Sequence, residues 1–65
     1  MENEMFTFVV CNHFAHSTES VYCTRHEANR KFDRLCAATE KQPEGDYVAY
    51  YAASVGGLIN SYRKA

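Results

Sequence analysis

Apolar and polar residues alternate along residues 5–14, which form the first patterned stretch of the chain. A period of two predicts a strand whose two faces meet different surroundings. One face carries Phe6, Phe8, Val10 and Phe14, interrupted by Asn12, and the other carries Met5, Thr7, Val9, Cys11 and His13. The small polar run 15–19 predicts a turn, and residues 20–23 predict a short return strand. We therefore expect an antiparallel hairpin over residues 5–23.

The pattern then changes to a helical period over residues 25–40. Thr24 and Glu27 match the capping box S/T-x-x-E, in which each side chain accepts a hydrogen bond from the other residue's backbone N–H. One helical stripe carries Ala28, Phe32, Leu35 and Thr39, with Cys36 at its edge. The helix is expected to end before Pro43, because proline disfavours helical backbone in the residue before it.

Residues 46–55 are rich in Tyr and Val and predict a third strand, although their three alanines leave a helix as the alternative. We prefer the strand because Gly56-Gly57 is a two-residue hairpin turn signal, after which residues 58–63 return as a fourth strand. With the two glycines as the loop, Val55 is expected opposite Leu58, Ala53 opposite Asn60 and Tyr51 opposite Tyr62.

The predicted fold class is α+β, a small two-layer β-β-α-β-β domain. A four-stranded antiparallel sheet carries one helix packed on one face. The 65 residues are expected to form a single domain, 1–65, with hairpins over 5–23 and 46–63 and a helix over 25–40. A domain of this size buries only about 60% of its unfolded surface. It often needs a disulfide, a metal or a second copy of the chain to stabilise it.

One helix covers only one face of such a sheet, yet apolar and aromatic residues occur on both faces of the predicted strands. An exposed apolar face usually marks an interface, and we expect one formed from Met5, Val9, Tyr47, Tyr50, Tyr51 and Tyr62. The partner would be a second copy, giving a homodimer, or a larger host protein bound by an inhibitor or adaptor. Short α+β proteins are common among phage and mobile-element accessory proteins that block host machinery, and the analogy with them rests on size and fold class alone. The alternative is that the tyrosines only shield a thin core.

Net charge and hydropathy limit the other partners and the compartment. The net charge of −1 predicts no general attraction to nucleic acid or acidic membranes. No apolar run approaches the roughly 20 residues of a membrane span, and the acidic N-terminus does not resemble a signal peptide. We therefore expect a cytoplasmic protein with reduced thiols and no membrane contact.

Cysteine and histidine are concentrated in residues 9–26, which hold five of the six such residues. The candidate metal ligands are Cys11, His13, Cys23 and His26, so a small zinc-stabilised domain is one alternative. Cys23 joins the first two ligands only if odd-numbered residues of the hairpin face each other. The chain lacks the C-x2–4-C knuckle of structural zinc sites, and a Cys11–Cys23 disulfide fits a cytoplasmic protein poorly. No metal or cofactor is expected.

A second alternative is nucleic-acid binding. The candidate residues on the helix are Arg25, Arg30, Lys31 and Arg34, with sheet tyrosines as a stacking platform. Against this, Glu27 is spaced to pair with Arg30 and Lys31, and Asp33 with Arg30, on a solvated face. The basic-aromatic strand of such platforms is also missing.

Enzyme chemistry has the least support. The chain contains no nucleophile-elbow, zinc-protease, P-loop or dinucleotide motif. Cys11 and His13 would be a candidate nucleophile and base, but two positions on one strand are about 6–7 Å apart, and no third group is evident to orient the imidazole. We therefore expect a non-enzymatic protein.

Overall fold

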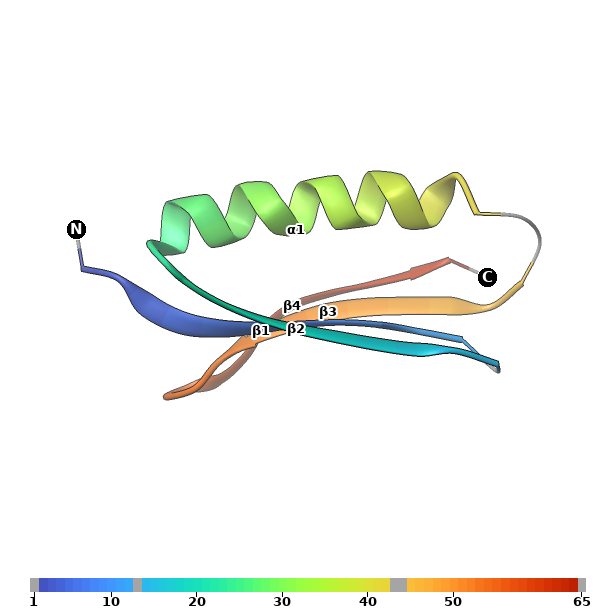
Figure 1. Ribbon diagram of the computed structural model, residues 1–65. Coiled ribbons are helices and arrows are strands. Elements are labelled where there is room, and N and C mark those ends of the chain that lie inside the picture. Colours follow the sequence, from blue (N-terminus) through green and yellow to red (C-terminus); the bar gives the residue numbers. More distant parts are fainter. Residues whose placement is uncertain (1, 13, 43–44, 65) are drawn as a thin grey trace.

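The strands and the helix form two layers. The computed structural model describes residues 2–12, 14–42 and 45–64. The elements are β1 (Glu4–Cys11), β2 (His16–Cys23), α1 (Arg25–Glu40), β3 (Tyr47–Ala53) and β4 (Gly57–Lys64). The strands pair in the order β2-β1-β3-β4, all antiparallel, and α1 lies along one face of the sheet (Figure 1). The predicted α+β class, with one helix on a four-stranded antiparallel sheet, is confirmed.

The helix begins and ends where the sequence predicts. The Thr24 hydroxyl accepts from the Glu27 N–H at 3.2 Å, and the Glu27 carboxylate accepts from the Thr24 N–H at 3.3 Å, so the capping box is complete. Ala28, Phe32 and Thr39 are buried. The Thr39 hydroxyl donates to the Leu35 carbonyl at 2.7 Å, so this buried hydroxyl is satisfied.

The core lies between α1 and the middle strands, and Tyr51 is at its centre. Its ring stacks on Phe8 with centroids 5.2 Å apart, lies 4.9 Å from Phe32 and meets Phe6 edge-on at 6.1 Å. Tyr51 is fully buried, and its hydroxyl donates to the side-chain oxygen of Asn29 on the helix. Four rings from two strands and the helix therefore hold the two layers together.

The first hairpin differs from its prediction because β2 is twice as long as expected. Residues 16–19 belong to β2 rather than to a turn, and β1 ends at Cys11. The Asn12 side chain accepts from the backbone N–H groups of Phe14 at 2.9 Å and Ala15 at 2.6 Å. This asparagine turn places Cys11 opposite His16, so odd-numbered residues of β1 face even-numbered residues of β2.

The second hairpin also has a different register, and the three expected pairs are wrong. Tyr51 faces Asn60, Ala53 faces Gly57, and Val55 lies in the turn rather than opposite Leu58. The turn covers residues 54–56, and a bulge interrupts the ladder between Tyr51 and Ala52. The bulge allows Leu58 to face away from the helix while Ile59 packs against the core.

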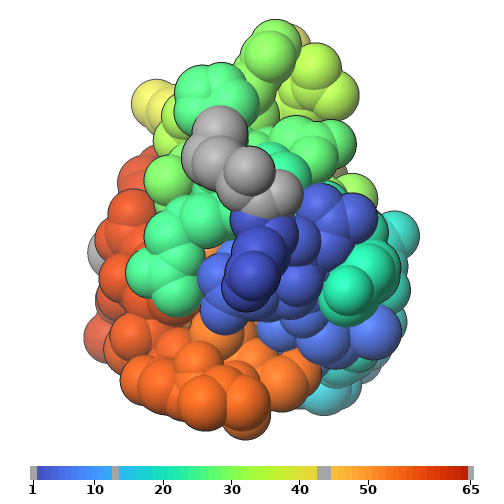
Figure 2. All heavy atoms as spheres, turned by 90° about the vertical axis from the view of Figure 1, so that its left-hand side faces the viewer, coloured from blue at the N-terminus to red at the C-terminus, as the bar shows by residue number. Residues whose placement is uncertain are grey.

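Figure 2 shows the molecule from one end of the sheet, so that the strands run toward the viewer. The helix layer lies above the strands, and the turn between β3 and β4 projects below the end of β1. Figure 1 places the N-terminal and C-terminal ends at opposite ends of the sheet.

Candidate functional site

The sheet face that points away from α1 is the first candidate surface, which we call the open face. Phe6 and Phe8 on β1 point into the core, so the alternate residues of β1 and their register partners point the other way. From β1 and β3, the open face contains Met5, Thr7, Val9, Cys11, Val48, Tyr50 and Ala52. From β2 and β4, it contains His16, Thr18, Ser20, Tyr22, Leu58, Ser61 and Arg63.

Apolar side chains occupy the centre and one end of the open face. Val9 lies between Thr18 and Tyr50, and it is only 5% exposed although it faces away from the helix. At the end near the β3–β4 turn, Met5, Tyr22 and Leu58 are 41%, 64% and 64% exposed. Exposed apolar groups that continue a shielded apolar centre form a patch that water solvates poorly.

Among the open-face residues named above, Arg63 carries a full charge, and this charge is paired with Asp46. The guanidinium donates to both carboxylate oxygens of Asp46, at 3.0 and 2.6 Å. This fork-like pairing raises the pKa of Arg63, because the hydrogen bonds and the negative charge of Asp46 favour the charged guanidinium. The open face therefore presents little net charge to a partner.

The structure divides the predicted interface residues between the two faces. Met5, Val9 and Tyr50 lie on the open face. Tyr51 is buried in the core, so it is not available to a partner, and Tyr62 packs partly against the same core. Tyr47 lies on the helix side beside Lys64, whose Nζ is 6.0 Å from the Tyr47 ring centroid.

Sequence reasoning missed two contributors to the open face, Tyr22 and Leu58. The short return strand predicted over 20–23 contained Tyr22 without a register to place it. Leu58 was assigned to a strand but paired with the wrong residue. Asn12 was the available signal for Tyr22, because an asparagine turn there sets the register of the hairpin.

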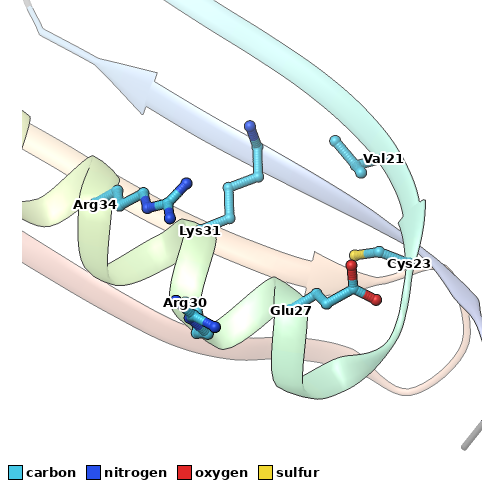
Figure 3. Close-up of a pocket in the computed structure, with 6 residues that line it drawn as sticks. All are labelled: Val21, Cys23, Glu27, Arg30, Lys31 and Arg34. Atoms are coloured by element: carbon cyan, nitrogen blue, oxygen red, sulfur yellow. The ribbon is translucent and has the colours of Figure 1, made fainter.

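A groove between α1 and β2 is the second candidate surface. The helix packs over β1, β3 and β4, which leaves the helix-side surface of β2 partly uncovered. The groove has a volume of about 320 Å³ and is lined by Val21, Cys23, Glu27, Arg30, Lys31 and Arg34. In Figure 3, Glu27 and Lys31 extend from the helix toward β2, and the Cys23 sulfur points back toward Glu27.

The predicted ion pairs along the helix are not formed among the described residues. Lys31 pairs instead with Glu19 on β2, with 2.5 Å between Nζ and the carboxylate oxygen. Glu27 accepts from the Thr24 hydroxyl at 2.9 Å, which completes its role in the cap. Arg25 lies outside the groove lining, and its guanidinium carbon is 5.9 Å from the Phe6 ring centroid. The basic helix face and the open-face tyrosines therefore lie on different layers and do not form one surface.

The surroundings of the Cys23 thiol in the groove disfavour its thiolate form. Burial raises the pKa of Cys23 above its ordinary value, and the negative charge of Glu27 raises it further, while Lys31 partly opposes both effects. Cysteine nucleophiles require a lowered pKa, because the thiolate is the reactive form. Cys36 also has a raised pKa, from burial and from Asp33.

The candidate metal ligands are not brought together. Cys23 faces Glu4 and points to the helix side, whereas Cys11 lies on the open face at the other end of β1. Their separation along the strands is about 23 Å, so a disulfide between them is also excluded. Among the described residues, no group of three or more Cys, His, Asp or Glu side chains forms a metal site. His13 lies outside the described residues, and His26 is exposed in the first turn of α1.

Comparisons with known proteins give no relative from which a function can be transferred. No protein-family model, no curated protein and no solved structure matches the chain. Within the part of the chain that the structure describes, no helix has the length and apolar character needed to cross a membrane.

Proposed function

We propose that this protein is a small non-enzymatic interaction module that contacts another protein through its open face. The observation that carries the proposal is the apolar centre of that face, where Val9 lies beside Tyr50. The exposed side chains of Met5, Tyr22 and Leu58 continue it to the end of the sheet. Tyr is well suited to a protein contact, since it gives a large contact area with few rotatable bonds.

The size of the open face agrees with a small protein interface. Four strands about 4.8 Å apart, the longest of eight residues, cover at most about 19 by 26 Å, or about 500 Å² in plan. Covering this face on two partners removes about 1,000 Å² from water, which is near the lower limit for a specific interface. Sheets that pack face to face with their strands roughly aligned use surfaces of this kind.

A second copy of the chain is the first form of the partner that we propose. The single charged group on the described part of the open face is paired with Asp46, so two copies meet without strong like-charge repulsion. Association would also supply a small domain with apolar burial that one helix does not provide. The second form is a larger host protein to which the module binds as an inhibitor or adaptor, in the manner of phage accessory proteins, by size-class analogy alone.

The cytoplasm is the compartment that we propose with this function. Cys11, Cys23 and Cys36 are free. Free thiols are the usual state of cysteine in a reducing compartment.

A matched pair of substitutions tests the proposal. Leu58→Lys places a charge on the open face, and Val55→Lys places the same charge in the adjacent turn, where the side chain is 84% exposed. Light scattering after size exclusion should show a dimer for the wild type and for Val55→Lys, and a monomer for Leu58→Lys. Tyr50→Lys, with circular dichroism as a check of folding, should behave as Leu58→Lys does.

A monomeric wild type at high protein concentration would remove the homodimer form of the proposal. The larger-partner form then requires capture of a protein that Val55→Lys retains and Leu58→Lys loses. Equal capture by the two variants, together with a monomeric wild type, would reject the open face as an interaction surface.

A further inference from the structure

The groove between α1 and β2 presents two guanidinium groups without an ion-pair partner among the described residues. Arg30 and Arg34 are both exposed and lie one helical turn apart, whereas the third cation of the groove, Lys31, is paired with Glu19. Like charges at this spacing destabilise a helix slightly, and their Cβ atoms are about 5–6 Å apart. An anionic ligand with two acidic groups at a similar spacing would relieve this repulsion.

The strand beside the groove has a free backbone edge. β2 is the outer strand of the sheet, and residues 16–20 are exposed along it. An outer strand presents a row of backbone N–H and C=O groups that another extended chain can pair with. The groove therefore has a pair of cations in its lining and a template for a peptide backbone along the strand beside it.

The side-chain repeat of an extended peptide agrees with the separation of Arg30 and Arg34. Alternate side chains of an extended peptide point to the same face and recur about every 6.6 Å, close to the spacing of Arg30 and Arg34. Val21 and Cys23 form the apolar part of the groove lining on β2, and the Cys23 side chain is almost fully buried. A peptide with acidic residues at every second position would place its carboxylates toward the helix while its backbone pairs with β2.

We propose that this groove binds an acidic extended peptide segment of a partner protein, which adds to the edge of β2 and pairs its carboxylates with Arg30 and Arg34. One feature favours a peptide over a nucleic acid. The free edge of β2 offers backbone hydrogen bonds that a peptide chain can complete. This inference concerns a different surface from the open face and does not rest on the proposal made for it.

A peptide-binding titration tests the inference. The probe is a fluorescein-labelled peptide that alternates Asp with Val, and binding is followed by fluorescence anisotropy at low salt. Arg30→Gln and Arg34→Gln should each weaken binding by about 10-fold or more, because each removes a charge-assisted hydrogen bond to a carboxylate. Arg25→Gln is the matched control on the same helix, outside the groove lining, and should change affinity by less than about twofold.

Three further probes distinguish the mechanism. The same peptide with proline at the Val positions lacks every second backbone N–H donor and fits a strand poorly, so it should bind at least about 10-fold more weakly. A peptide with Lys in place of Asp should not bind. In the complex, hydrogen exchange should slow at those backbone amides of residues 16–22 that point to the outer edge of β2. A peptide held by its charges alone, without backbone pairing, would not slow their exchange.

Specific outcomes would overturn the inference. They are no binding at millimolar peptide, equal effects of Arg34→Gln and Arg25→Gln, or equal affinity of the proline peptide. Tighter binding of a single-stranded oligonucleotide of the same charge would assign the groove to nucleic acid instead. Leu58→Lys should bind the peptide as the wild type does, so a failure at the groove is separable from a failure at the open face.

Discussion

Tyr51 connects more of the core than any other single side chain described above. It contacts the rings of Phe6, Phe8 and Phe32, and its hydroxyl is bonded to Asn29 on the helix. Burial raises the pKa of Tyr51 above its ordinary value, although Arg25 partly opposes the effect and Asp33 adds to it. The phenol therefore stays neutral and serves as a hydrogen-bond donor between the two layers.

Tyr51→Phe should lower the free energy of unfolding by about 1 kcal/mol. The substitution keeps the stacked ring and removes only the hydroxyl, and the exposed Asn29 side chain can turn to water instead. Urea denaturation measures the change. Tyr22→Phe is the control, because Tyr22 is 64% exposed and its replacement should leave stability within about 0.5 kcal/mol. Equal effects of the two substitutions would contradict the role given to the Tyr51 hydroxyl.

Stability should fall as the pH rises above about 8.5, the ordinary thiol pKa, and continue to fall past about 10, that of tyrosine. Burial raises the folded-state pKa of Cys23, Cys36 and Tyr51. The unfolded chain loses these protons first, so it binds fewer protons than the folded chain in this window, and the free energy of unfolding decreases with pH. Melting temperatures across this range measure the slope. The variant Cys23→Val with Cys36→Ala should have a flatter curve below pH 10, and an unchanged slope would contradict this cause.

At the scale of elements, the helix cap is the feature whose contribution is most easily isolated. Thr24→Ala removes the acceptor for the Glu27 N–H, which is 3.2 Å from the Thr24 hydroxyl oxygen. The loss should cost about 1 kcal/mol of stability, measured by denaturation followed at a helical circular-dichroism signal. Thr24→Ser retains a hydroxyl at the cap and should cost much less. If Thr24→Ala left the free energy of unfolding unchanged, the capping box would not be a source of stability for α1.

The turn between β3 and β4 depends on glycine backbone geometry. Gly56 has a φ of +103° and Gly57 a φ of +79°, and a Cβ at either position would meet no atom within 4 Å. Gly56→Ala should therefore destabilise the protein through backbone strain alone, by about 1–2 kcal/mol. Thermal denaturation measures this effect. Val55→Ala in the same turn should be nearly neutral because Val55 is 84% exposed, and equal losses would argue against strain at Gly56.

The helix could be predicted from the sequence because its determinants are local. The capping box, the apolar stripe and the following proline all lie within the predicted segment or beside it, and α1 matches residues 25–40. The hairpins could not be placed to the same accuracy. β2 is an edge strand whose polar residues 16–20 meet water, so this segment has the composition of a loop. In the second hairpin, the turn covers residues 54–56 and Gly57 belongs to β4, which moves the pairing by three positions at Ala53, and the bulge at Tyr51/Ala52 moves it back by one.

At the scale of the whole molecule, register decides which predicted site residues can act together. Apolar residues on both sheet faces were apparent from alternation, but the assignment of Tyr50 to the open face and of Tyr51 to the core required the position of α1. The same register separates Cys11 from Cys23. The groove could not be predicted, because it depends on how far the helix lies to one side of the sheet.

Hydrogen exchange should divide the sheet into protected and open strands. β1 and β3 have a strand on each side and the helix above them, whereas β2 is an edge that the helix leaves partly uncovered. Backbone amides of Phe6–Val10 and Ala49–Tyr51 that bond to a neighbouring strand should therefore exchange most slowly, and those of residues 16–20 most rapidly. Mass spectrometry of exchanged fragments measures this order. Faster exchange in β1 than in β2 would contradict the central position of β1.

The sheet order also makes the chain separable into two halves. β1 with β2 forms one hairpin and β3 with β4 forms the other, and the two hairpins meet along the β1–β3 ladder, over which α1 packs. A piece ending after α1 and a piece beginning before β3 each contain a whole hairpin, so the two pieces can reassemble by forming one ladder and one layer contact. The same geometry allows two chains to exchange hairpins while keeping every contact within each sheet. The protein can therefore serve as a split reporter, in which association of the two pieces restores the buried environment of Tyr51.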